Sequence, residues 1–339
     1  MFKLPNTYEE ALEYAYAGRF ETGPNSLYVL PTILLVKSLD LKLPKLPDID
    51  LYISEDGQNA ELLRSADQPY SPLALSNYDF VLIKKEAINV IRDRAEKELM
   101  KMTSNQNIPV ATRMHSLRKA SMLVAEDIMA DPSPENIQRG KKMVNGFVYL
   151  LMRDPSSYLY LASLSSHDPY TLQHSVGTAV NSIILGRKLG VKDEKDLTEL
   201  GLGGLLHDVG KTNVKPEIIN KPGPLDDNEW AEMKQHSTWG FDIIKSNDEI
   251  SVQAKRAVLE HHEDKSGKGY PHGMNWSDVH DFAKIVALCD IFNALTTDRS
   301  YSKAQKPYEA LKLIRDKMQH KFDDEVFKNM VEIYGGKID

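Results

Sequence analysis

The stretch Gly203–Lys211, GGLLHDVGK, decides how the rest of this chain is interpreted. An apolar helical run ends here on the adjacent pair His207 and Asp208, and Lys211 follows within one helical turn. A neutral imidazole and an ionised carboxylate suit Fe, Mn or Zn, and a mixed set of such groups can hold two ions. Because a single His-Asp pair often arises by chance, its meaning depends on the other residues that accompany it.

Further candidate ligands lie in or beside apolar helical patterns on both sides of this stretch. Asp290 lies inside the apolar segment 285–295, where an unpaired carboxylate would cost on the order of several kcal/mol of desolvation, so it requires a cation. Asp208 is the natural bridge between two ions because it has two oxygens. Scattered core or surface histidines are the alternative, which suits any one of these residues better than the whole set. The candidate metal ligands are His174, His207, Asp208, His236, His261, His262 and Asp290.

Composition bounds the class of protein. At 339 residues, 41% hydrophobic and 27% charged, the sequence is typical of a globular protein with full-sized cores. The net charge of -7 argues against nonspecific binding to nucleic acid polymers, although a metal site would still attract a small phosphorylated substrate. The single Cys289 excludes an internal disulfide framework and favours a reducing compartment. With no signal peptide pattern and no apolar run long enough to span a bilayer, the sequence predicts a cytoplasmic protein without a membrane partner.

The sequence divides into three regions by pattern. Residues 1–85 predict a small mixed α/β domain, regulatory or for dimerisation, with a helix at Glu9–Tyr16 and strands that complete a meander. Residues 86–153 predict connecting helices, because apolar residues recur there at helical spacing. Residues 154–339 predict a helical bundle. Its expected helices are Ser156–Ser165, Tyr170–Leu189, Lys192–His207, Asp226–Ser246, Ser251–His262, Val279–Thr296 and Pro307–Met318, with a short one near the terminus.

Cationic side chains and a glycine-rich loop accompany the candidate ligands. Lys211 lies in a GKT triplet, but the preceding residues lack a glycine that a phosphate-binding loop requires, so we interpret it as a cation aimed at a substrate phosphate or at Asp208. After His262 comes a loop that ends in Gly269-Tyr270-Pro271. Arg299 is placed to clamp a phosphate bidentately, with Lys303 as a second cation.

In the order H…HDxGK…H…HHE…GYP…D, with KPGPL between, residues 170–304 resemble the HD-GYP family of cyclic di-GMP phosphodiesterases. The resemblance implies an HD-type helical bundle and a centre of two divalent ions, Fe first and Mn second. It implies hydrolysis of cyclic di-GMP to pGpG or GMP. It implies that the candidate ligands above hold the metal, with Asp208 and Lys211 catalytic. Substrate contacts would come from Lys211, Tyr270, Arg299 and Lys303. Protein partners at the GYP loop and the N-terminal domain, and a homodimer, are further implications.

The sequence departs from the family pattern at three positions. Ser266 replaces an Asp of the loop, and Asn293 replaces the second Asp of the DxxDAL motif. Both changes predict looser hydrogen-bond support for the loop. Tyr170 stands where members with three ions often carry a Glu, which favours a binuclear centre.

Three hypotheses follow from these features. The first is metal-assisted hydrolysis of cyclic di-GMP, in which the ions and Lys211 neutralise the developing charge. The second is a cyclic di-GMP-binding adaptor with weak or no turnover, suggested by Ser266 and Asn293. The third is an HD-type hydrolase acting on another phosphorylated nucleotide. A substrate panel separates these hypotheses.

Overall fold

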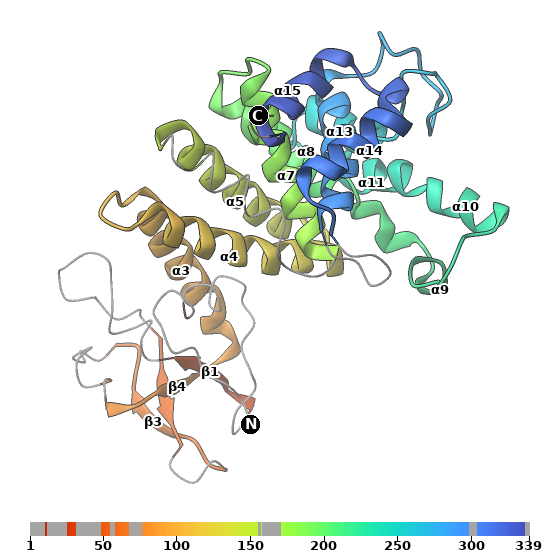
Figure 1. Ribbon diagram of the computed structural model, residues 1–339. Coiled ribbons are helices and arrows are strands. Elements are labelled where there is room, and N and C mark those ends of the chain that lie inside the picture. The colour runs from red at the N-terminus through yellow and green to blue at the C-terminus, as the bar shows by residue number, and fades with distance from the viewer. Residues whose placement is uncertain are drawn as a thin grey trace. The chain divides into compact units, whose positions relative to one another are not determined.

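The computed structural model describes residues 11, 26–31, 49–54, 58–67, 75, 77–154, 157, 171–297 and 304–335. The chain forms two compact units, Met1–Ala120 and Ser121–Asp339. It is mainly helical, with a small antiparallel sheet in the N-terminal unit, as the sequence predicts (Figure 1). The finer division at residues 85 and 153 stays a prediction.

The N-terminal sheet has the strand order β1-β4-β2-β3 and is not the meander expected from the sequence. Strand β4 (Phe80–Ile83) pairs with β1 (Tyr28–Pro31) and β2 (Leu51–Ile53), while β2 also pairs with β3 (Glu61–Arg64). Three consecutive side chains of β4 are fully buried, so this strand gains most from a central position with a neighbour on each side. The predicted helix at 9–16 and turn at 56–57 lie outside the described residues, apart from Ala11.

Helices follow the sheet at once. A short 3₁₀ turn, η3 (Lys85–Ala87), leads into α3 (Ile88–Ser104), and α4 (Val110–Ala130) follows. Arg113 of α4 donates from Nη1 to the carbonyl of Thr103 at 3.2 Å, which ties the start of α4 to the end of α3.

The second unit is a helical bundle. In its middle α7, α8 and α13 lie together, with α14 and α15 beside them and α9 and α10 at one edge (Figure 1). The elements after α4 are α5 (Pro134–Arg153), α7 (Thr171–Lys188), α8 (Glu194–Leu206), η4 (Val209–Asn213), α9 (Pro216–Ile219), α10 (Asp227–Lys234), α11 (His236–Ile244), α12 (Val252–Glu260), α13 (Asp281–Thr296), α14 (Pro307–Met318), η5 (Gln319–Lys321) and α15 (Asp324–Tyr334).

Small residues let these helices approach closely around the end of α8. A Cβ at Gly204 would lie 2.9 Å from the Cα of Ala179 on α7. A Cβ at Gly210 would lie 1.9 Å from the carbonyl oxygen of His236 on α11. Contacts under 3.0 Å do not occur with real side chains, so only glycine fits at both positions. The GGLLHDVG stretch is thereby pressed between α7 and α11.

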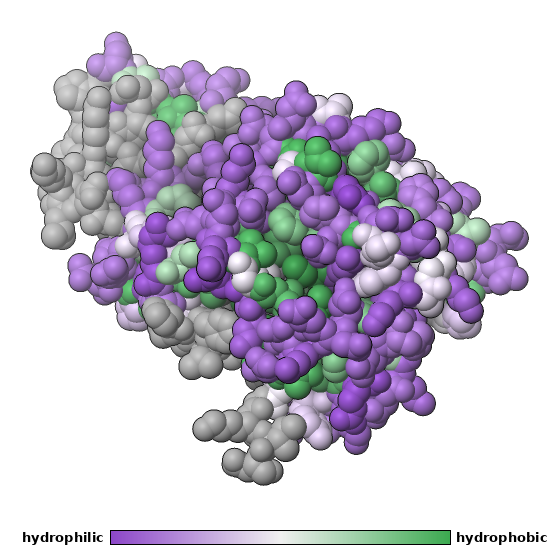
Figure 2. All heavy atoms as spheres, turned by 90° about the horizontal axis from the view of Figure 1, so that it is seen from above, coloured by the Kyte–Doolittle hydropathy of each residue, from purple (hydrophilic) through white to green (hydrophobic). Residues whose placement is uncertain are grey.

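Two helix predictions of this unit differ from the structure or lie outside it. The segment 226–246, expected as one helix, breaks at Gln235, whose amide bonds back to the carbonyl of Glu232 at 3.0 Å and so tightens the last turn of α10. The predicted helix Ser156–Ser165 lies outside the described residues, apart from Ser157. On the face drawn in Figure 2 most exposed residues are hydrophilic, and hydrophobic ones gather in limited patches. Within the described ranges, none of the helices combines the length and apolar character that crossing a bilayer would need.

Candidate metal centre

The His207–Asp208 pair lies directly after the last residue of α8, as the sequence pattern predicts. The N-terminus of α8 is fixed by Asp193, whose side chain accepts from the amides of Lys195 and Asp196. At the other end, η4 turns the chain away immediately after Asp208. The pair therefore lies at the turn between α8 and η4.

The remaining candidate ligands come from other helices of the bundle. His174 lies in the first turn of α7, and His236 is the first residue of α11. His261 and His262 directly follow α12, while Asp290 lies in the middle of α13. Because these helices pack against one another, residues far apart in sequence meet in one place.

The structure brings these side chains together in two groups. In the carboxylate triad, His174, His207 and Asp290, one potential ligand atom from each residue lies within 4.8 Å of the others. The imidazole triad, His236, His261 and His262, meets the same limit. Except for the more accessible His262 and Asp290, the members are buried.

Asp208 lies between the two triads. Its Oδ2 is 3.3 Å from Nε2 of His207 and 3.9 Å from Nε2 of His174, both in the carboxylate triad. Its other oxygen, Oδ1, is 3.5 Å from Nε2 of His236 in the imidazole triad. One oxygen thus faces each triad, which is the geometry required of a bridging carboxylate.

Backbone carbonyls fix the orientation of three imidazoles. The Nδ1 atoms of His207, His236 and His261 donate to the carbonyls of Gly204, Met233 and Val258 at 2.7–2.8 Å. A carbonyl only accepts, so the proton of each neutral ring is on Nδ1, and Nε2 keeps its lone pair. Metal-ligating histidines are held in this way in proteins.

These lone pairs face other acceptors. Nε2 of His236 lies 3.3 Å from Nε2 of His261. In the carboxylate triad, Nε2 of His174 forms a 2.9 Å ion pair with Oδ1 of Asp290. Nε2 of His207 is buried and has no hydrogen-bond partner among the described residues. Opposed acceptors without a donor are unfavourable, and a cation between them removes the conflict. The residues therefore fit a divalent metal in each triad.

Burial and neighbouring charges together set the protonation states of the candidate ligands. Burial lowers the pKa of His261 and of His236, and lowers that of His262 to about 3, so these rings are neutral ligands. Burial would raise the pKa of Asp208, but the charges of His207 and Lys211 hold it well below the usual value. Against burial, the charge of Asp208 raises the pKa of His207. The negative charge of Asp208, which favours a proton on His207, also favours a divalent cation beside that ring.

Lys211 lies beside the bridging carboxylate. Its Nζ is 2.7 Å from Oδ2 of Asp208, and its side chain is 30% exposed. Of the two roles considered from the sequence, pairing with Asp208 is present in the structure. Because this side chain is partly exposed, a ligand that arrives from solvent can reach it.

The loop after His262 packs against the imidazole triad. The ring of Tyr270 stacks on that of His262, with centroids 4.5 Å apart and planes at 28°. The loop is held by the buried Glu263, whose carboxylate accepts from the amides of His272 and Met274 at 2.7 and 2.9 Å. Burial raises the pKa of the Tyr270 phenol, which is therefore neutral.

Both departures from the family pattern have partners in the structure. The Ser266 hydroxyl donates to Oδ1 of Asp264 at 2.5 Å, and the Ser266 amide donates to the same oxygen at 2.9 Å. Oδ1 of Asn293 accepts from Nδ1 of His174 at 2.9 Å. Both side chains thus have hydrogen-bond partners, and looser support of the loop stays a prediction.

Three residues of the sequence prediction are not placed. Arg299, Lys303 and Tyr170 lie outside the described residues. Sequence reasoning also missed Trp230 on α10, which lies in an edge-to-face contact with Tyr270. The one feature of the sequence that could have indicated a role for Trp230 is its position within two helical turns of His236, a candidate ligand.

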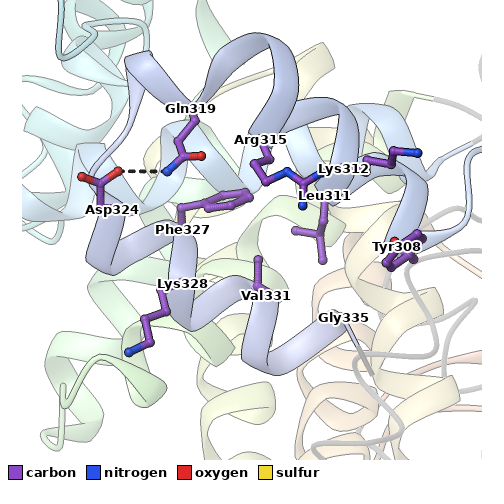
Figure 3. A pocket seen from close by; sticks show the side chains of 10 residues that line it. All are labelled: Tyr308, Leu311, Lys312, Arg315, Gln319, Asp324, Phe327, Lys328, Val331 and Gly335. Atoms are coloured by element: carbon purple, nitrogen blue, oxygen red, sulfur yellow. Dashed lines mark hydrogen bonds between the residues drawn. The ribbon is translucent and has the colours of Figure 1, made fainter. Parts of the chain in front are cut away.

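A separate cavity of about 330 Å³ lies between α14 and α15. Figure 3 shows its apolar floor, which includes Leu311, Phe327 and Val331, with Lys312 and Lys328 at its edges. It shares no residue with the two triads.

The part of the chain that holds this centre matches a family model and several known proteins. The family model for the HD domain matches residues 160–326, the part of the chain that holds every candidate ligand. Over 185 residues the chain is 36% identical to the cyclic di-GMP phosphodiesterase PA4108 of Pseudomonas aeruginosa, covering 55% of this chain and 44% of that one. It is 33% identical to the 3'3'-cGAMP-specific phosphodiesterase 3 of Vibrio cholerae, covering 48% of this chain and 35% of that one. The chain thus spans less than half the length of these relatives.

One solved structure shares the fold over most of the chain. Bd1817, described as an HDG"Y"P protein from Bdellovibrio bacteriovorus, superposes with a TM-score of 0.63 at 19% identity, covering 91% of this chain and 100% of that one.

Proposed function

We propose that this chain, an HD domain protein related to the HD-GYP phosphodiesterases, is an enzyme that hydrolyses a phosphodiester bond of a cyclic dinucleotide. The observation that carries the proposal is the position of Asp208, with one oxygen toward each triad of candidate ligands. Relatives named for cyclic di-GMP and for 3'3'-cGAMP both match the chain, so the two dinucleotides are the substrates to compare. Cyclic di-GMP, with pGpG or GMP as product, is our first choice because a relative that is 36% identical over 185 residues carries that name.

Each triad would hold one ion, and Asp208 would contact both. Iron is our first candidate and manganese the second, since imidazole and carboxylate ligands suit both. Divalent ions at this place supply a nucleophile at neutral pH and positive charge against the phosphoryl oxygens. The hydrogen bonds of three imidazoles support metal binding, because their fixed Nδ1 protons leave the Nε2 lone pairs directed inward.

Lys211 would act on both the protein and the substrate. Its ammonium holds Asp208 ionised, and its exposed part would meet a non-bridging phosphate oxygen of the substrate. As a charged hydrogen bond to phosphate it would contribute on the order of 1.5–3 kcal/mol. The Tyr270 phenol, neutral and beside His262, would donate to the substrate and not accept from it. Arg299 and Lys303 remain proposed contacts to the second phosphate or a guanine.

The test is metal analysis of the purified protein, followed by incubation with cyclic di-GMP and with 3'3'-cGAMP and chromatography of the products. We expect about two ions per chain and hydrolysis of at least one dinucleotide. A panel of other phosphorylated nucleotides covers the remaining hydrolase hypothesis. A fully metal-loaded protein that hydrolyses none of these compounds would overturn the proposed activity.

The adaptor hypothesis stays the second candidate. It depended on Ser266 and Asn293, and both side chains make hydrogen bonds that support the loop and His174. Binding of cyclic di-GMP by the metal-loaded protein with no product formed would still favour it.

A further inference from the structure

We propose that Trp230, together with Tyr270, forms a subsite that holds a purine base of the substrate by stacking. The proposal deepens the function proposed above and depends on it. Trp230 is a specificity residue in this view: it contacts the nucleoside and leaves the phosphodiester chemistry to the metal centre.

A cyclic dinucleotide needs recognition of two kinds. Its phosphates match the cationic part of the site, which consists of the ions and Lys211. Its purine bases are flat and aromatic, and the candidate ligands and Lys211 offer them no broad apolar surface. Stacking on an aromatic side chain suits a purine because each base has a π-face. A base subsite therefore has to be aromatic and has to lie beside the triads.

An aromatic row of this kind leads outward from the imidazole triad. Tyr270 stacks on the ligand His262, with ring centroids 4.5 Å apart. Trp230 then meets Tyr270 edge to face, with centroids 6.3 Å apart and planes at 81°. The indole is therefore one aromatic ring removed from a candidate metal ligand.

Trp230 is exposed where a core tryptophan would be covered. It is 47% exposed, although tryptophan is one of the largest apolar side chains. Its indole N–H has no hydrogen-bond partner in the described part of the chain, so the edge of the ring can also donate to a ligand. An exposed tryptophan by itself is ordinary on a protein surface. The contact with Tyr270, at the border of the metal centre, distinguishes this one.

The backbone that carries Trp230 is held in place. Helix α10 begins with a capping box. The side chain of Asp226 accepts from the backbone amide of Glu229, and the side chain of Glu229 accepts from the backbone amide of Asp226. The Glu229 carboxylate also pairs with Lys221, and Glu232 pairs with Lys215 at 2.9 Å. A stacking surface on a rigid helix loses little freedom when a ligand binds, which favours affinity.

The experiment compares Trp230→Ala and Trp230→Phe with the wild-type metal-loaded protein. KM and kcat are measured for the cyclic dinucleotide that the wild type hydrolyses best, and for methyl p-nitrophenyl phosphate, a phosphodiester without a purine. Metal content is measured in every variant. Tyr308→Ala is the matched control, because Tyr308 is similarly exposed, at 51%, but lies on α14 outside the centre.

We expect Trp230→Ala to raise KM for the dinucleotide roughly 5- to 150-fold, the range that loss of one base-stacking contact produces. Metal content, kcat and all constants for methyl p-nitrophenyl phosphate should stay within about twofold. Trp230→Phe should restore most of the lost affinity, because a phenyl ring still stacks.

Two results would overturn the subsite. One is an unchanged KM for the dinucleotide in Trp230→Ala, and the other is an equal rise of KM for both substrates, which would indicate a structural role. If the wild type binds a dinucleotide without turnover, the dissociation constant replaces KM and the same expectations hold. A wild type that neither binds nor hydrolyses dinucleotides would refute the proposed function, and the subsite with it.

Discussion

The carboxylate triad and the imidazole triad offer similar numbers of ligands but differ in charge. The first contains Asp290 and faces Oδ2 of Asp208, so two carboxylates lie near its ion position. The second consists of imidazoles alone and faces Oδ1 of Asp208, while the charge of Asp290 also acts on its His262. Because neutral imidazoles compensate less of a divalent charge, we expect the carboxylate triad to bind its ion more tightly. The difference implies a centre that loses one ion before the other.

The largest effect is expected at Asp208, which lies between the two triads. Asp208→Asn removes the charge that the two proposed ions would share and leaves Lys211 without its carboxylate partner. Substitution of partners that only support a ligand already costs roughly 10- to 100-fold in affinity or activity, so loss of this carboxylate should cost more than about 100-fold. Metal analysis and turnover assays measure it. The control is Asp242→Asn, which changes an exposed aspartate paired with Lys245. Full metal content in Asp208→Asn would refute the bridging assignment.

One-ion variants sharpen the comparison. His261→Ala should lower the metal content from about two ions to about one, and the remaining ion should keep the affinity of the tighter wild-type site. Asp290→Asn should instead remove the tighter binding phase of a metal titration. The titration follows metal uptake in the apo protein at fixed pH. If the two variants lose the same phase, the triads are not separate ion positions.

For Lys211→Ala we expect a smaller loss of nucleotide affinity or turnover and no change in metal content. An ammonium cannot ligate while it is charged, so both triads should keep their metal. Loss of a charged contact to phosphate should lower nucleotide affinity or kcat/KM by roughly tenfold or more. Metal content is measured in the same sample. Lost metal in this variant would mean that Lys211 serves mainly to hold Asp208, while unchanged metal, affinity and rate would end the phosphate role.

The smallest effect is expected for Asn293→Leu, which should act on the carboxylate triad alone. It removes the acceptor that orients His174 through Nδ1. A supporting partner of this kind contributes roughly 10-fold or somewhat more in metal affinity. In a titration, only the tighter phase should weaken. Weakening of both phases would show that Asn293 supports the bundle and not one ligand.

Particular elements show why some of the fold was predictable and some was not. The helices of the second unit have strong apolar periodicity, so most of them were predicted, including the positions of His207 and His261 at helix ends. The order of the N-terminal strands was not, because pairing of β1 with β4 joins residues about fifty positions apart and leaves no local signal. The break at Gln235 was missed because Met233, Lys234 and Gln235, the residues at the end of α10, are good helix formers.

The sequence by itself determined which side chains can ligate and that they occur at or near helix ends, because residue chemistry and helical periodicity are local. Only the tertiary structure decided how they divide into two triads, which way each Asp208 oxygen points, and that Lys211, Asn293 and Trp230 lie beside them. Nδ1 of His174 and the Asn293 side chain meet across 119 positions of sequence. Such long-range contacts depend on how closely whole helices pack, as at Gly204 and Gly210. No single stretch of sequence specifies the packing distance between two helices.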